Sequence, residues 1–180
     1  DRHQGDWERL GEILAREART LEKAGADFLV LCTNTMHLVA PTMKAAVAIP
    51  LLHIADATAQ RIREDGFRTV GLLGTRFTME EPFYRGSLEE DHGLEVLVPS
   101  REDRDVVHRV IYEELVMGRI LPESREEFRR IVGRLHEEGA QGVILGCTEI
   151  GLLLKPEDSE LPLFDTALIH AQVAAEYALT

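Results

Sequence analysis

Two cysteines are the side chains of this sequence with the greatest chemical potential. Cys32 and Cys147 each follow a short apolar run, and each precedes a polar segment that leads into a predicted helix. In open α/β sheets, ligands bind at the carboxyl ends of the strands. The N-terminus of a helix lowers a thiol pKa to about 3.5–7.5. We therefore expect both thiols to be acidified and to act as bases or nucleophiles near neutral pH.

The polar residues after each cysteine could bind a substrate. Thr33, Asn34 and Thr35 follow the first cysteine, and Thr148 and Glu149 follow the second. Their hydroxyl and amide groups, together with backbone N–H groups, are suited to binding a carboxylate. Glu149 is an acceptor only while it is ionised, so it suits a substrate ammonium group instead.

A pair of facing thiols suits the inversion of a stereocentre. One group removes the α-proton from one face of the carbon, and the other returns a proton from the opposite face. A lone cysteine at a strand end is more often a small buried residue, and a disulfide would require that the two strand ends meet in an oxidising compartment. The repeated Cys-Thr-polar pattern favours the catalytic interpretation.

Buried strands alternate with helices along the chain. Short apolar runs predict strands at 27–31, 50–54, 69–75, 94–98, 142–146 and 162–164. Three- and four-residue apolar spacing predicts helices at 6–24, 35–48, 55–65, 80–91, 103–117, 123–138 and 166–178. This alternation is typical of an α/β fold with mostly parallel sheets flanked by helices.

The two halves of the sequence resemble each other. GADFLVLCTN at 25–34 is similar to GAQGVILGCTE at 139–149, and PLLHIADATA at 50–59 is similar to PLFDTALIHA at 162–171. The offsets are 147 − 32 = 115 and 162 − 50 = 112 residues. We therefore predict two pseudo-symmetric lobes, the first formed by residues 1–53 plus 164–180 and the second by residues 54–163. At this offset the counterpart of strand 69–75 would precede residue 1, so we expect a first lobe without its opening strand, in a chain that is a fragment or was trimmed.

Composition excludes several classes of protein. The chain of 180 residues carries a formal net charge of −12, which argues against a nucleic-acid partner. No apolar stretch approaches the roughly 20 residues that span a bilayer. Two cysteines are too few for a disulfide framework or a typical structural zinc site. We expect a cytoplasmic protein without a bound metal.

Three segments give the sequence a family resemblance. LCTNTMH at 31–37, GTRFT at 74–78 and GCTEI at 146–150 resemble the aspartate/glutamate racemase family of cofactor-independent amino-acid racemases. The resemblance implies two α/β lobes with the site in the cleft, a homodimer, an amino-acid substrate and no pyridoxal phosphate.

The resemblance also implies roles for individual residues. Cys32 and Cys147 would be the two acid/base thiols. The α-carboxylate and its neighbours would be bound by Thr33, Asn34 and Thr35, while Thr148 and Glu149 would lie near the amino group. The family's threonine loop would correspond to Thr75 and Thr78. Aspartate-type members carry a lysine where Val116 or a neighbour stands here, so broad specificity is as well supported as aspartate or glutamate specificity.

Other interpretations remain open at this point. Hydantoin racemases, maleate isomerases and arylmalonate decarboxylases belong to the same superfamily, although the decarboxylases need only one of the two cysteines. A non-catalytic remnant is a further alternative, because a cleft without its first loop could fail to hold a substrate. Depressed thiol pKa values would favour the enzyme, and ordinary values would favour the remnant.

Overall fold

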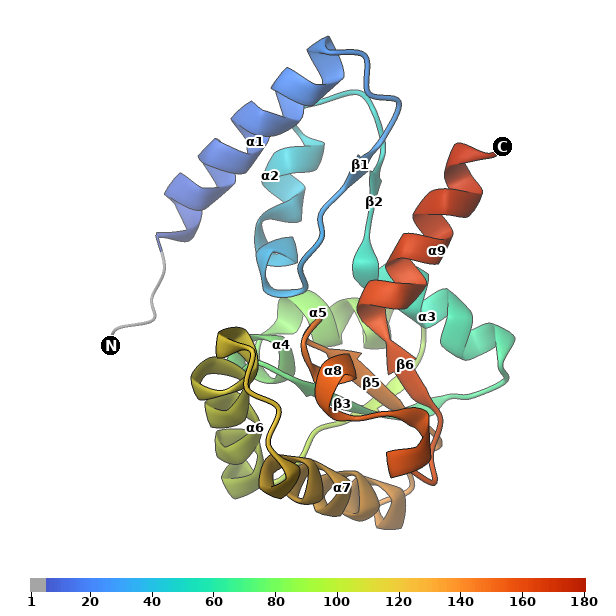
Figure 1. Ribbon diagram of the computed structural model, residues 1–180. Helices are drawn as coiled ribbons and strands as arrows, with labels where there is room; N and C mark the ends of the chain where they lie inside the picture. The colour runs from blue at the N-terminus through green and yellow to red at the C-terminus, as the bar shows by residue number, and fades with distance from the viewer. Residues whose placement is uncertain (1–5) are drawn as a thin grey trace.

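A computed structural model describes residues 6–180 and contains two parallel sheets (Figure 1). The larger sheet has the strand order β4-β3-β5-β6, and the smaller one pairs β1 with β2. The strands are β1 (Leu29–Val30), β2 (Leu51–Leu52), β3 (Thr69–Gly74), β4 (Glu95–Leu97), β5 (Val143–Gly146) and β6 (Leu163–Asp165). All described pairings are parallel, which confirms the predicted α/β class.

Helices flank both sheets. The α-helices are α1 (Trp7–Lys23), α2 (Ala40–Lys44), α3 (Ile54–Glu64), α4 (Arg76–Glu80), α5 (Pro82–Gly86), α6 (Arg101–Glu113), α7 (Pro122–Glu137), α8 (Ile150–Leu153) and α9 (Thr166–Ala178). The shorter helical turns are η1 (Thr35–Val39), η2 (Ser87–Asp91), η3 (Leu115–Met117) and η4 (Pro156–Asp158). Helix α9 starts beside the larger sheet and runs upward past β1 and β2 (Figure 1). There, Phe28 and Tyr177 meet edge to face, with their ring centroids 5.0 Å apart.

Buried apolar residues form two separate clusters. The larger cluster surrounds β3 and β5, whose apolar side chains are almost fully excluded from solvent, as expected for central parallel strands. The smaller cluster joins α1 and α2 to the short strands and contains Ala18, Leu29, Ala40, Met43 and Leu51. The cysteine loops leave the carboxyl ends of one strand from each sheet, β1 and β5.

The structure supports the internal repeat. Helix α1 begins at residue 7 and α7 at residue 122, so the helices repeat the offset of 122 − 7 = 115. The β1–β2 pair corresponds to β5–β6, and α3 corresponds to α9, with an offset of 166 − 54 = 112. β5 pairs with both β3 and β6, whereas β1 pairs only with β2 among the described residues. The smaller sheet is therefore the less complete copy.

Three of the predicted helices are interrupted, and the one at 103–117 is α-helical only to Glu113 and is followed by the 3₁₀ turn η3. The segment predicted as a helix at 35–48 is a 3₁₀ turn followed by the five-residue α2, which has a proline in its first turn. The segment at 80–91 is divided because Glu81 is extended, with φ −87° and ψ 145°, immediately before Pro82. A residue before proline is biased away from helical geometry, which explains the break.

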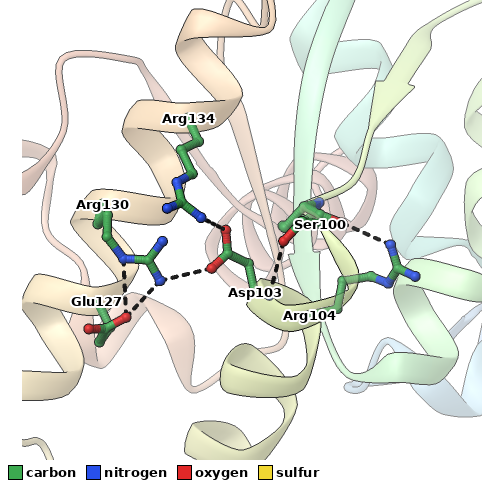
Figure 2. Close-up of polar contacts among 7 residues, drawn as sticks. Ser100, Asp103, Arg104, Glu127, Arg130 and Arg134 are labelled. Carbon is green, nitrogen blue, oxygen red and sulfur yellow. Dashed lines mark hydrogen bonds and ion pairs between the residues drawn. The ribbon is translucent and has the colours of Figure 1, made fainter.

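A buried carboxylate joins α6 to α7 (Figure 2). The Asp103 side chain is 5% exposed and accepts hydrogen bonds of 2.8 Å from both Arg130 and Arg134. Burial alone would raise the pKa of Asp103, but the two arginines outweigh burial and lower it. Ser100 caps the same helix by accepting from the backbone N–H of Asp103. This cluster fixes the two helices that cover one face of the sheet.

Candidate active site

Cys147 lies in the loop between β5 and α8, beside a carboxylate. Its Sγ donates to Oε2 of Glu149 at 2.9 Å, and the hydroxyl of Thr148 donates to the same oxygen at 2.8 Å. Burial of the thiol, followed by the hydrogen bond and negative charge of Glu149, raises the pKa of Cys147 to about 12. The expectation of an acidified thiol is therefore wrong for Cys147.

Burial of the sulfur and the neighbouring carboxylate outweigh the small contribution that the short following helix can make. Helix α8 has four residues, and its N-cap residue is Glu149. A single turn contributes few aligned peptide dipoles, and the nearest charge to the thiol is an anion. Burial would raise the pKa of Glu149, but hydrogen bonds from Cys147 and Thr148 lower it. Glu149 thus stays ionised and keeps the neighbouring thiol protonated.

Two glycines allow the ends of β3 and β5 to pack closely where the Cys147 loop begins. Gly74 and Gly146 are register partners at the ends of β3 and β5. A Cβ atom on Gly146 would lie 2.9 Å from the carbonyl oxygen of Leu73, closer than real Cβ contacts. The absence of side chains at this point lets the two strand ends approach each other directly beside Cys147.

Cys32 lies in a more open environment after β1. The residue is exposed, and its Sγ makes a long contact of 3.9 Å to the carbonyl oxygen of Val30. The next peptide is held tightly, because the N–H of Thr33 donates to Leu31 at 2.8 Å and its carbonyl accepts from Nδ1 of His37 at 2.6 Å. An accessible sulfur on a fixed backbone suits a group that must meet a substrate.

His37 connects the Cys32 loop to the start of α3 through two hydrogen bonds. Its Nδ1–H donates to Thr33, and its Nε2 accepts from the backbone N–H of Ile54 at 3.2 Å, so the ring is neutral. Burial first, and then the nearby ring of His53, lower the pKa of His37 to about 3. The ring centroids of His53 and His170 lie 4.3 and 6.1 Å from that of His37. The sequence places His37 at the end of the LCTNTMH segment but does not reveal this structural role.

The predicted threonines connect the two loops that follow β1 and β3. Thr35 and Thr75 lie with their hydroxyl oxygens 3.3 Å apart, and those of Thr75 and Thr78 are 3.2 Å apart. Thr75 also caps α4 by accepting from the backbone N–H of Thr78. Thr78 is fully buried, so its hydroxyl supports Thr75. The structure thus brings Thr35 of the Cys32 loop next to Thr75 and Thr78, which follow β3.

Asn34 connects the first cysteine loop to the larger sheet. Its side chain is buried, and Nδ2 donates to the hydroxyl of Thr166 at 3.0 Å. Thr166 in turn donates to the carbonyl oxygen of Leu145 at 2.8 Å. Sequence reasoning missed Thr166, although its place after the carboxyl end of β6 is a position where site residues gather.

One further residue, Tyr112, interacts with Cys147. Burial raises the pKa of Tyr112, and the negative charge that Cys147 carries once it is deprotonated raises it further. Tyr112 stacks at a tilt on His108, which accepts from the backbone N–H of Arg76. The Arg76 side chain pairs with Asp105 at 2.6 Å on the surface. Nothing in the sequence singles out Tyr112 beyond its place in a predicted helix.

Both cysteines lie outside the groove that α1 and α2 form. This open groove has a volume of about 910 Å³ and is lined by residues such as Arg9, Arg16 and Thr42. Residues 6–180 contain no group of three or more His, Cys, Asp or Glu side chains placed to hold a metal ion. In the same part of the chain, no helix is both long and apolar enough to cross a membrane.

Comparisons with known proteins give consistent results. A model of the Asp/Glu/Hydantoin racemase family matches residues 1–174. The chain is 27% identical over 170 residues to the broad specificity amino-acid racemase RacX of Bacillus subtilis, covering 93% of this chain and 71% of that protein.

Solved structures are also similar. A candidate Asp/Glu racemase from Yersinia pestis superimposes with a TM-score of 0.94 at 51% identity, covering 99% of this chain and 78% of that chain. An aspartate racemase homologue from Pyrococcus horikoshii gives a TM-score of 0.88 at 39% identity, again covering 99% and 78%.

Proposed function

The chain belongs to the Asp/Glu/Hydantoin racemase family, and from this premise we propose that it racemises an amino acid by proton transfer between Cys32 and Cys147. The observation that carries the proposal is the placement of one thiol in each of two loops that hydrogen bonds join. Asn34 links the Cys32 loop to Leu145 through Thr166, and Leu145 lies two residues before Cys147.

The two thiols lie in different environments, since Cys32 is exposed and Cys147 is half-buried beside Glu149, and this difference gives each a role. Cys147 is protonated because its pKa is raised, so it is the proton donor for one direction of the reaction. A Cys32 thiolate would take the α-proton, forming an S–H bond while the C–H electron pair remains on the α-carbon. Cys147 would then deliver its proton to the opposite face and become the thiolate, ready for the reverse reaction.

The substrate would itself adjust Cys147. Glu149 remains ionised beside this sulfur and accepts from both Cys147 and Thr148. A substrate ammonium group bound to Glu149 would neutralise its charge and so lower the pKa of Cys147. Binding and activation of the second thiol would then be one event.

Fixed donors would stabilise the carbanion that forms. The hydroxyls of Thr33 and Thr35, with nearby backbone N–H groups, would hold the substrate carboxylate, where negative charge develops during proton removal, while Thr148 and Glu149 would lie near the amino group. The hydroxyl of Thr75 bonds to that of Thr35, while the buried Thr78 holds Thr75 in place. We assign to Asn34 the role of holding the Cys32 loop in place through its hydrogen bond to Thr166.

For the substrate, we propose an amino acid with broad side-chain tolerance. The similarity to RacX, named a broad specificity amino-acid racemase, supports this choice, and the similarity to an aspartate racemase homologue keeps aspartate and glutamate in the set. Because the family description includes hydantoin racemases, a hydantoin belongs in the same panel.

The reaction would need no pyridoxal phosphate, so activity should survive treatment with hydroxylamine, a carbonyl reagent. Catalysis by two free thiols also fits a reducing compartment, and we propose a cytoplasmic location. A homodimer is proposed from the family resemblance and is tested by light scattering after gel filtration.

The direct test is to incubate the protein with single enantiomers and to follow the other enantiomer by chiral chromatography. Conversion of at least one amino acid is expected. Cys32→Ser and Cys147→Ser should each lower kcat by about 10²–10⁴-fold, because each removes one acid/base group. No conversion across the panel would favour the non-catalytic remnant, and conversion of the hydantoin alone would favour a hydantoin racemase.

A further inference from the structure

Thr166 makes hydrogen bonds that its own helix does not need. It is the first residue of α9 and is completely buried. Asp165 already caps this helix, because its carboxylate accepts from the backbone N–H groups of Ala167 and Leu168. The hydroxyl of Thr166 is therefore free to bond outside the helix, and it does so twice.

The direction of both bonds follows from the chemistry of the partners. The carbonyl oxygen of Leu145 can only accept, so the single hydroxyl proton of Thr166 points to it. The Thr166 oxygen must then accept from Nδ2 of Asn34. This arrangement fixes the Asn34 amide, and its buried Oδ1 has no hydrogen-bond partner within the described residues.

One side chain thereby bonds to both cysteine-bearing segments. Asn34 lies two residues after Cys32, and Leu145 lies two residues before Cys147. The other link between the loops, from Thr35 to Thr75, reaches β3 instead of the strand that carries Cys147. The Asn34–Thr166–Leu145 path is thus the shorter polar route from one thiol segment to the other.

We propose that Thr166 is a positioning residue that sets the separation and alignment of the two thiols across the substrate. The inference rests on the proposed two-thiol racemisation. Proton transfer to opposite faces of one carbon requires that both sulfurs be placed well, and a shift of about 1 Å in such a geometry can lower the rate by about 10²-fold.

Thr166→Val is the informative change, since valine has nearly the same shape but no hydroxyl. We expect kcat to fall by about 10–100-fold while KM changes by less than about threefold, because the substrate-binding groups remain and only the alignment is lost. Thr166→Ser retains the hydroxyl and should restore kcat to within about threefold of the parent protein.

Thr58→Val is the matched control. Thr58 is also completely buried, and its hydroxyl donates at 2.7 Å to the carbonyl oxygen of Ile54 within its own helix. This variant should lose stability to a similar degree and keep kcat. Thermal unfolding of all three variants shows whether each is folded at the assay temperature.

A second readout does not depend on turnover. Bifunctional maleimides of graded length report the separation of the two sulfurs, because only a spacer that matches it crosslinks Cys32 to Cys147. The spacer that crosslinks best in the parent protein should also do so in Thr166→Ser, and crosslinking by it should drop in Thr166→Val.

The outcomes separate this inference from the proposed function. A parent protein without racemase activity contradicts the proposed function, and the crosslinking series then still decides whether Thr166 sets the geometry. The positioning role is overturned if Thr166→Val keeps the parent kcat and crosslinking pattern. It is also overturned if Thr166→Ser is as impaired as Thr166→Val, or if Thr58→Val lowers kcat equally.

Discussion

Replacing Glu149 by glutamine should make the thiol of Cys147 more acidic. The pKa of Cys147 is raised from 9.0 to about 12 by burial first, and then by the hydrogen bond and charge of Glu149. Glu149→Gln removes the charge and leaves burial in place. A unit charge about 4 Å away contributes about 4 kcal/mol at an effective dielectric constant of about 20.

That value is an upper limit, because Glu149 is only partly buried and water screens its charge. Allowing for screening, we expect the pKa of Cys147 to fall by about 1–2 units, equivalent to about 1.4–2.8 kcal/mol. At any pH well below the pKa, the thiolate fraction would then rise by about 10–100-fold.

Alkylation by iodoacetamide measures this change, because the thiolate is the reacting form. Rates are followed from pH 7 to pH 10, and mass spectrometry of the peptides separates Cys147 from Cys32. The exposed Glu157 provides a control, since Glu157→Gln changes the net charge equally but lies away from the thiol. An unchanged pH profile of Cys147 in Glu149→Gln would refute the electrostatic account of this site.

Three other predictions concern the thiols and the stability of the fold. In the parent protein at neutral pH, iodoacetamide should label the exposed Cys32 well before Cys147, as peptide mass spectrometry would show. Asp103→Asn should lower the free energy of unfolding in urea at pH 7 by about 1–3 kcal/mol, since two part-exposed arginines lose a buried partner. Folding lowers the pKa of Asp103. The stability lost in Asp103→Asn should therefore be greatest above about pH 4, and it should become smaller as the pH falls further and the carboxyl group of the parent protein is protonated. Folding lowers the pKa of His37 to about 3, so the parent protein should lose stability as the pH falls below about 6.5. His37→Gln should be less stable than the parent at pH 7, but its stability should depend less on pH over this range.

The sequence predicted the elements of this fold well because their signals are local. Apolar runs located β3 and β5, and the apolar spacing over 6–24 located both ends of α1 to within one residue. The break at Glu81 was missed because the helical periodicity continues across Pro82. Helix α8 was missed because four residues are too few to produce a period.

The site was only partly predictable because its contacts connect distant parts of the chain. Spacing indicated both cysteine loops, but Asn34 and Thr166 are 132 residues apart and meet only after folding. The direction of the Cys147 pKa shift was predicted wrongly for the same reason. It depends on how deeply the sulfur is buried and on where the Glu149 side chain points, neither of which a motif specifies.

The central claim is that two thiols act on opposite faces of one carbon, and isotope exchange tests it most directly. Each enantiomer of an accepted amino acid is incubated in heavy water with the parent protein, Cys32→Ser and Cys147→Ser. With the parent, deuterium should appear on the α-carbon of the inverted product. Each variant should retain α-proton exchange with one enantiomer and lose it with the other, and the two variants should show opposite preferences. Equal exchange of both enantiomers in both variants would contradict the two-thiol account.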